Sequence, residues 1–255
     1  MSPPPPPRPA APALVDDLAA LHKSTHEAVT TLKKQKKYDA AVAQLEPLLA
    51  REQAAPDWGL GRAETLSTMA TLAFFLSNIP DRQSLGVDLY RRCREAKAEA
   101  LGAEHPDTLR ACNELALACE AAKMFSEALA VSTPLLKSAK EVLGPSHRDT
   151  LLYTNTHALV LSRQDDTKSR TDALHLLQDV LKLCRADTEL APRDKQRAVV
   201  LAQAEVAGCY ERLKQHGKAQ SEFAAAAKAA EKVFGPKDDD AIKFGKKAEE
   251  NRNLA

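Results

Sequence analysis

One short pattern occurs twice in this sequence and constrains the fold more than any other feature. The stretch "LGAEHPDTLRACNELALAC" begins at Leu101, and "LGPSHRDTLLYTNTHALVL" begins at Leu143. After a shift of 42 residues, Leu, Gly, His, Asp, Thr, Leu, Asn, Ala and Leu occupy the same places. Self-similarity at a period of about 20 to 50 residues is typical of proteins that stack one supersecondary unit on the next. The sequence therefore predicts a repeat architecture.

Small residues recur along the chain at a matching interval. One set defines the expected second helix of each unit, at steps of 45, 42, 45 and 46 residues: Ala41, Gly86, Ala128, Ala173 and Ala219. The matching set in the first helices is Ala73, Ala116, Ala158 and Ala207. Paired small residues let antiparallel helices approach to about 8 to 10 Å. We therefore expect helix pairs whose two members touch at these positions.

The composition favours an all-α fold. Apolar residues make up 44% of the chain, and no stretch alternates β-branched and polar residues as a strand does. Gly102, Gly144 and Gly235 follow expected helix ends, where glycine can adopt the left-handed conformation. Ser146 to Asp149 resembles a capping box with Asp in place of Glu. The expected helices span about residues 14–36, 38–54, 60–78, 82–101, 106–122, 125–143, 147–163, 170–186, 193–214, 216–234 and 237–252.

The first thirteen residues, MSPPPPPRPAAPA, contain seven of the fifteen prolines. Proline lacks a backbone donor and fixes φ, so residues 1–13 are expected to be a disordered, proline-rich tail before a helical repeat domain at residues 14–255. Pro3, Pro6 and Arg8 match the P-x-x-P-x-R ligand of Src-homology-3 domains. The alternative to a plain disordered leader is therefore a tail that binds a polyproline-binding domain of a partner.

Charge and cysteine content argue against several classes of protein. With 36 Lys and Arg against 35 Asp and Glu, we expect neither a nucleic-acid nor a membrane partner. No run approaches the roughly 20 apolar residues of a membrane span, and the N-terminus lacks a secretory signal pattern. The five cysteines have no C-x-x-C spacing and are expected to be buried apolar residues in a reducing compartment. The expected location is cytoplasmic.

The motifs around the repeat point to a known family. They are "LG..HPDT" from Leu101, "N.LAL.C" from Asn113, and "YDAA", "FSEAL" and "HGKAQSEF" at the turns into second helices. With these motifs the chain resembles tetratricopeptide repeat (TPR) proteins, in particular the ~42-residue repeats of kinesin light chains. The resemblance covers about residues 20–245 and implies a right-handed α-solenoid of about five antiparallel helix pairs. A C-terminal capping helix follows, with Ile242 and Phe244 expected to dock.

The sequence lacks the common catalytic and nucleotide-binding motifs. G-x-x-x-x-G-K-[ST], G-x-S-x-G, H-E-x-x-H and G-x-G-x-x-G are all absent. His22 and His26 lie four residues apart on one expected helix, but Glu27 is not spaced as a third ligand on that face. A solvent or groove role for these histidines is favoured over a metal site. We expect no enzyme activity, no cofactor and no metal.

The resemblance implies a concave groove lined by the first helix of each pair. Carried over position by position, its partner-binding residues are Lys23, His26, Lys33, Phe74, Arg110, Asn113, Leu117, Glu120, Asn155 and Leu159. Asn113 and Asn155 are the strongest candidates, because an amide offers both a donor and an acceptor to an extended peptide. The alternative is an Asn that bonds neighbouring helices. Ala70 and Phe74 stand where a carboxylate clamp needs polar residues, so no such clamp is expected.

These patterns lead to one functional hypothesis and one alternative. The hypothesis is a non-catalytic adaptor or scaffold that binds a peptide or helical segment of a partner protein in the groove. The alternative is a structural subunit of a larger assembly that uses its convex or end surfaces.

Overall fold

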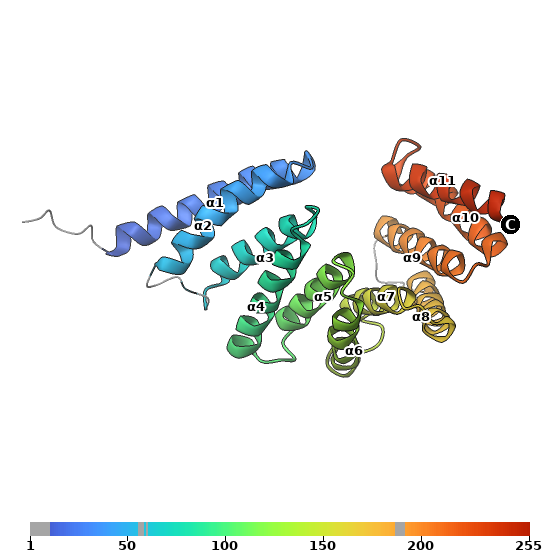
Figure 1. The fold of residues 1–255 in the computed structure, drawn as a ribbon, viewed down its shortest axis with the longest axis horizontal. Coiled ribbons are helices and arrows are strands. Elements are labelled where there is room, and N and C mark those ends of the chain that lie inside the picture. Colours follow the sequence, from blue (N-terminus) through green and yellow to red (C-terminus); the bar gives the residue numbers. More distant parts are fainter. Residues whose placement is uncertain (1–10, 56–58, 60, 187–191) are drawn as a thin grey trace, which may run out of the picture. The chain divides into compact units, whose positions relative to one another are not determined.

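The computed structural model describes residues 11–55, 59, 61–186 and 192–255. Within these ranges the chain forms eleven α-helices and no β-strand (Figure 1). The all-α repeat class expected from the sequence is confirmed. The contacts between helices divide the chain into two compact units, one ending at Met124 and one beginning at Phe125. Each is described by itself.

Unit 1 is a succession of antiparallel helices, each packed on the next. Its helices are α1 (Ala11–Lys34), α2 (Tyr38–Ala54), α3 (Ala63–Ser77), α4 (Gln83–Leu101) and α5 (Pro106–Ala121). The odd-numbered helices also contact one another, α1 with α3 and α3 with α5. Helix α1 begins at Ala11, three residues earlier than expected. The proline motif of Pro3, Pro6 and Arg8 lies outside the described residues.

Unit 2 follows the same plan. Its helices are α6 (Phe125–Val142), α7 (Arg148–Ser162), α8 (Thr167–Ala186), α9 (Pro192–Arg212), α10 (His216–Phe234) and α11 (Asp239–Leu254). Successive helices pack on each other throughout, and α7 also contacts α9. No described helix has the length and apolar character needed to cross a membrane.

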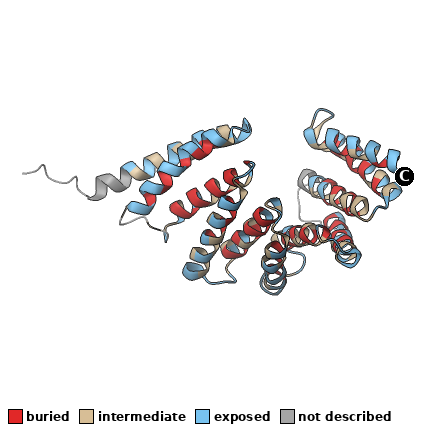
Figure 2. Ribbon diagram, viewed as in Figure 1, coloured by how far each residue is buried: buried red, intermediate tan, exposed pale blue. Residues whose placement is uncertain are grey.

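The small residues predicted to let helices touch are all buried. Every alanine of the two sets is completely inaccessible to solvent, and Gly86 is buried as well. At Gly86 the two helices approach so closely that an added Cβ would lie 2.8 Å from the carbonyl oxygen of Ala73. Larger side chains fill the space beside these contacts, such as Leu45, Phe75 and Leu177, and full burial of each contributes about 1.5–3 kcal/mol. Figure 2 shows the buried residues on the faces that adjacent helices share.

The repeated phrase forms the joint that ends one helix pair and begins the next. Gly102, Gly144 and Gly235 have φ of +94°, +92° and +107°. The ψ values of Gly102 and Gly235 are 158° and 161°. For these two glycines this is not the left-handed helical region expected from the sequence but a region open almost only to glycine. Each glycine's carbonyl then accepts a hydrogen bond from the backbone N–H three residues on.

The residue three positions after each of these glycines is the N-cap of the next helix. The side chains of His105 and His147 accept hydrogen bonds through Nδ1 from the backbone N–H groups of Asp107 and Asp149, at 3.2 and 3.1 Å. Asp238 does the same in the last joint, at 3.0 Å from the N–H of Asp240. The capping box predicted at Ser146 is therefore wrong, because His147 caps α7.

The turns inside the helix pairs use a different device. Lys36, Lys123 and Lys214 have φ of 55°, 60° and 57°, just past the ends of α1, α5 and α9. In each case the next residue donates its N–H to a carbonyl five residues back, as in the Schellman motif. Glycine is the usual residue at this position, so lysine there carries a backbone cost.

Helix α11 closes unit 2 against α10. Phe244 is buried as expected, but Ile242 is 45% exposed and does not dock. The buried Asn251 instead adds polar contacts: its side-chain N–H donates to Glu211 at 3.0 Å and its Oδ1 lies 2.9 Å from His216. Lys247 pairs with the same Glu211 carboxylate at 3.1 Å. Polar side chains therefore hold α11 against the rest of unit 2, whereas the sequence predicted a second apolar contact from Ile242.

Candidate functional site

A groove of about 610 Å³ lies in unit 1 along α1, α3 and α5, and we call it the unit 1 groove. Its lining residues are His26, Val29, Thr30 and Lys33 from α1; Ala63, Leu66, Ser67, Ala70, Thr71, Phe74 and Phe75 from α3; Tyr90, Lys97 and Leu101 from α4; and Asp107, Arg110 and Glu114 from α5. The first helices of the pairs thus supply most of the lining. Four of the ten residues predicted to bind a partner are among the lining residues.

The part of the unit 1 groove that α3 lines, here called its floor, carries mostly small side chains. Ser67, Ala70 and Thr71 from α3 are small, and the Thr71 hydroxyl donates to the carbonyl of Ser67 at 2.8 Å. The Thr30 hydroxyl on α1 is likewise bonded within its own helix. Phe74 closes one part of the floor, packed edge-on against Phe75. The floor therefore leaves room for a chain segment.

Both signs of charge flank this floor. The Lys33 ammonium lies 3.9 Å from the centre of the Phe74 ring, a cation–π contact. Arg110 pairs with Asp107 at 3.3 Å. Burial raises the pKa of Glu114 above its usual range, and the nearby Lys97 and Arg110 partly offset that rise. The groove can therefore contact polar as well as apolar groups.

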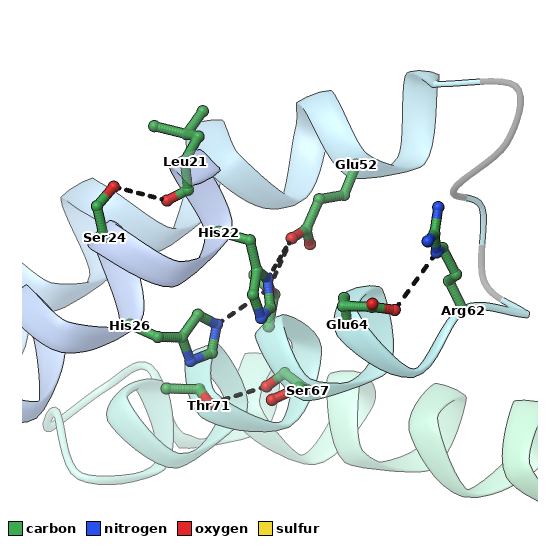
Figure 3. Close-up of polar contacts among 10 residues, drawn as sticks. Leu21, His22, Ser24, His26, Glu52, Arg62, Glu64, Ser67 and Thr71 are labelled. Atoms are coloured by element: carbon green, nitrogen blue, oxygen red, sulfur yellow. Dashed lines mark hydrogen bonds and ion pairs between the residues drawn. The ribbon is translucent and has the colours of Figure 1, made fainter. Parts of the chain in front are cut away.

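The groove residue His26 belongs to a polar network that reaches into the interior of unit 1 (Figure 3). We call it the His–Thr–Glu network; its members are His22, His26, Glu52 and Thr68. Nδ1 of His22 lies 2.7 Å from Oε1 of Glu52, and the Thr68 hydroxyl donates to the same oxygen at 3.1 Å. Nε2 of His26 lies 3.2 Å from the Thr68 hydroxyl. His26, a groove residue, is thus linked to a carboxylate inside unit 1.

Glu52 is completely buried, and its second oxygen, Oε2, has no hydrogen-bond partner. Burial raises the pKa of this carboxyl group, although its bonds to His22 and Thr68 oppose the rise. Burial also lowers the pKa of His26, and the neighbouring His22 lowers it further. Within the described residues, no three His, Cys, Asp or Glu side chains are arranged to hold one metal ion.

The structure brings four of the predicted partner-binding residues together. His26, Lys33, Phe74 and Arg110 all line the unit 1 groove. The other predicted residues of unit 1 lie on the same helices outside the groove lining: Lys23 is exposed, Leu117 is 38% exposed, Glu120 is half-buried and Asn113 is buried. Asn155 and Leu159 lie on α7 of unit 2, both half-buried.

The two asparagines share an unusual environment. Asn113 is only 4% exposed, and its Oδ1 is buried without a hydrogen-bond partner. Oδ1 of Asn155 is also buried without a partner. An unsatisfied buried acceptor costs about 1–3 kcal/mol. The two asparagines, which occupy equivalent positions in the sequence repeat, thus also share an unsatisfied side-chain oxygen.

Sequence reasoning missed Glu52, Thr68 and the contribution of α4 to the groove. A signal for Glu52 was present, because it follows the buried Leu45 by seven residues and so lies on the apolar stripe of its helix. A charged residue on such a stripe requires a partner. The partner, His22, lies 30 residues away in sequence, and local patterns do not identify such a contact.

Comparison with solved structures decides the fold. The structure of nearly identical TPR-like repeats from a Podosopora anserina protein described as a kinesin light chain matches with a TM-score of 0.64 and 21% identity, over 82% of this chain and 95% of that one. A single-residue variant of the same protein matches with a TM-score of 0.66 and 22% identity, over 83% and 95%.

The chain has the TPR-like repeat fold. BtubC (BKLC) from P. vanneervenii shares this TPR-like fold with a TM-score of 0.62 and 13% identity, over 89% of this chain and 94% of that one. No family model and no curated protein matches the sequence. The TPR-like fold, in the form found in kinesin light chain repeats, thus agrees with the motifs around Leu101 and Asn113.

Proposed function

We propose that this protein is a non-catalytic adaptor that binds a segment of a partner protein in the unit 1 groove. The observation that carries the proposal is the groove itself, which the first helices line and in which His26, Lys33, Phe74 and Arg110 converge. Its floor of small side chains accepts a chain segment, and its flanks offer charged and aromatic contacts. TPR-like folds typically serve as protein-interaction scaffolds, which agrees with this proposal.

The unpartnered amides support a role in binding extended backbone. Rotation about the side-chain bonds would turn Oδ1 of Asn113 from its buried position toward the groove side of α5. There it would accept a hydrogen bond from a backbone N–H of the bound segment and recover the cost of its unsatisfied state. Asn155 on α7 would do the same for a segment bound to unit 2.

A pull-down with matched variants tests the proposal. The full chain, a Ser67→Arg variant and a Ser84→Arg variant would be used as baits, and captured proteins would be compared by mass spectrometry. Ser67 lies on the groove floor, whereas Ser84 is exposed at the start of α4, outside the groove lining. Partners that Ser67→Arg loses and Ser84→Arg retains are groove partners. If the two variants capture the same proteins, the groove assignment is wrong.

For a partner found in this way, the asparagines provide a quantitative test. Replacing Asn113 by Ala should weaken binding in the unit 1 groove about fivefold, and replacing Asn155 should weaken binding to unit 2 by a similar factor, because each lost hydrogen bond is worth about 1 kcal/mol. Isothermal titration calorimetry would measure the dissociation constant. An unchanged constant would show that the amides do not contact the partner.

A second candidate function is a fixed subunit of a larger assembly. Leu85 on α4 and Leu254 at the end of α11 are 51% and 64% exposed, and a partner on a convex or end surface would cover such residues. Crosslinks from these positions, and not from the groove, would favour this alternative.

A polyproline-binding domain that binds Pro3, Pro6 and Arg8 is a further proposed partner. The five free cysteines, four of them buried, fit a cytoplasmic location.

A further inference from the structure

The His–Thr–Glu network joins three helices at one point (Figure 3). His22 and His26 come from α1, Glu52 from the last turn of α2, and Thr68 from α3. Imidazole nitrogens make the contacts from α1: His22 to Glu52 at 2.7 Å, His22 to Thr68 at 3.3 Å and His26 to Thr68 at 3.2 Å. The attachment of α1 here depends on where these imidazoles carry protons.

Apolar contacts hold α1 only in part. Between residues 17 and 34, where its side chains are described, Val29 is the one buried apolar residue, and Leu32 packs half-buried against the same core. By comparison, α3 buries Leu66, Met69 and Phe75. Leu18 and Leu21 are half-buried as well, so the polar network adds to a modest apolar contact in keeping α1 in place.

The hydrogen bonds of the network have a defined direction. The Thr68 hydroxyl has a single proton and donates it to Oε1 of Glu52. Thr68 must then accept from Nε2–H of His26, a donor that the neutral tautomer protonated at Nε2 and the imidazolium ion both provide. A second proton on His26 would place a charge beside His22, whose ring centre lies 4.3 Å away. The acidic groups that face the pair are Glu52 on α2 and Glu64 on α3, and Glu64 is already paired with Arg62 at 3.4 Å.

We propose that the His–Thr–Glu network is a proton-operated latch that holds α1 against α2 and α3 at neutral pH and releases α1 on mild acidification. Helix α1 contributes His26, Val29, Thr30 and Lys33 to the unit 1 groove. Release removes that wall, so partner binding in the groove weakens in acid. This consequence rests on the proposed function, whereas the latch itself does not.

The two titrating groups act in opposite directions, and this sets the pH window. Burial and His22 lower the pKa of docked His26 below 6.5, so released α1 binds the proton more readily and release is favoured as pH falls below 6.5. Burial raises the pKa of docked Glu52 above 4.5, so docking is favoured as pH falls further toward 4.5. Release is therefore expected to begin below pH 6.5 and to reverse as Glu52 becomes protonated at lower pH.

Hydrogen–deuterium exchange of the full chain tests the latch. Exchange of residues 17–34 and of residues 106–121 in α5 would be compared at about pH 7.4 and 5.5, with EDTA present and intrinsic rates corrected. Protection of α1 should fall at the lower pH, by up to about tenfold from His26 alone, because that pH is one unit below the ordinary histidine pKa. Protection of α5 should stay constant. Equal loss in both helices would mean general unfolding and would overturn the proposal.

Variants assign the effect to the network. In His26→Gln the amide can still donate to Thr68 but does not titrate, so the loss of α1 protection between pH 7.4 and 5.5 should disappear. His175→Gln, an exposed histidine on α8, is the matched control and should respond as the unmodified chain does. A wild-type response in His26→Gln would overturn the latch.

A further measurement uses the unmodified chain, so its result does not depend on whether the His26→Gln variant folds. Nuclear magnetic resonance of the His26 ring should give a pKa below 6.5, and a value at or above 6.5 would also overturn the latch. None of these experiments needs a partner, so failure of the latch and failure of groove binding are separately visible.

Discussion

Gly86 on α4 lies so close to Ala73 on α3 that a methyl group at Gly86 would stand 2.8 Å from the Ala73 carbonyl oxygen and 2.9 Å from the Ser77 backbone nitrogen. Real Cβ atoms are essentially never found at such distances. Gly86→Ala should therefore destabilise the protein by about 1–3 kcal/mol, because the two helices must move apart. Urea unfolding followed by circular dichroism measures the change.

Gly245 provides the matched control, because it lies inside α11 and an added Cβ there meets nothing within 4 Å. Gly245→Ala should raise the free energy of unfolding by about 0.5–1 kcal/mol through the helix preference of alanine. If Gly86→Ala also raised the free energy of unfolding, helix propensity and not the close approach would govern Gly86.

Lys36 pairs a left-handed backbone, with φ of 55°, with a side chain that is exposed to solvent. Lys36→Gly should stabilise the protein by about 0.5–1 kcal/mol, because glycine adopts this conformation without a Cβ penalty. Lys36→Ala keeps the penalty and should leave the free energy of unfolding within about 0.5 kcal/mol of its original value. Thermal melts of the three proteins would show the order; a gain for Ala equal to that for Gly contradicts the backbone explanation.

His147 and Ser146 separate two accounts of how α7 begins. His147→Ala should cost about 1 kcal/mol of stability, because the N–H of Asp149 loses its acceptor. His147→Asp should retain most of the stability, since Asp238 caps α11 in the same way. Ser146→Ala should have little effect. If Ser146→Ala lowered the free energy of unfolding more than His147→Ala did, as measured by chemical denaturation, the capping-box interpretation would be correct after all.

Cys93 and Cys209 are buried, and burial raises the pKa of each thiol to about 11. The thiolate is the reactive form, so alkylation of both at about pH 8 should be slow in the folded protein and fast in denaturant. Mass spectrometry after a short iodoacetamide treatment would locate the modified residues. Rapid labelling of Cys93 or Cys209 in the folded chain would be incompatible with the packing of α4 and α9.

The helices were predictable from the sequence because their ends have local causes. Gly102 and His105 close one helix and open the next within four residues, and the sequence places both at a boundary. The buried small residues were likewise predictable, since Ala73 and Gly86 belong to a periodic set. At Ile242 the same reasoning failed: the cap helix is fastened by Asn251 and Lys247, and an apolar residue in a polar helix does not reveal which face will dock.

The groove could be predicted only in outline. His26, Lys33, Phe74 and Arg110 were placed by repeat position, and the structure brings them together in one groove. Asn113 follows Arg110 by less than one turn and was expected to face the groove, but it is buried. The rotation of each helix about its axis sets such differences, and it depends on packing against helices far away in sequence. For the same reason the pairing of Glu52 with His22 was not foreseen.

The joint from Gly102 to Thr108 makes several of its backbone hydrogen bonds with neighbours close in sequence. The Gly102 N–H bonds back to Ala98, the His105 N–H bonds to Gly102, and the His105 ring serves Asp107. Such a joint forms a boundary between two repeat units whose contacts are local in sequence. A gene can gain or lose a whole hairpin between two of these boundaries without inventing a new connection, so changes in array length are an accessible evolutionary route for this chain.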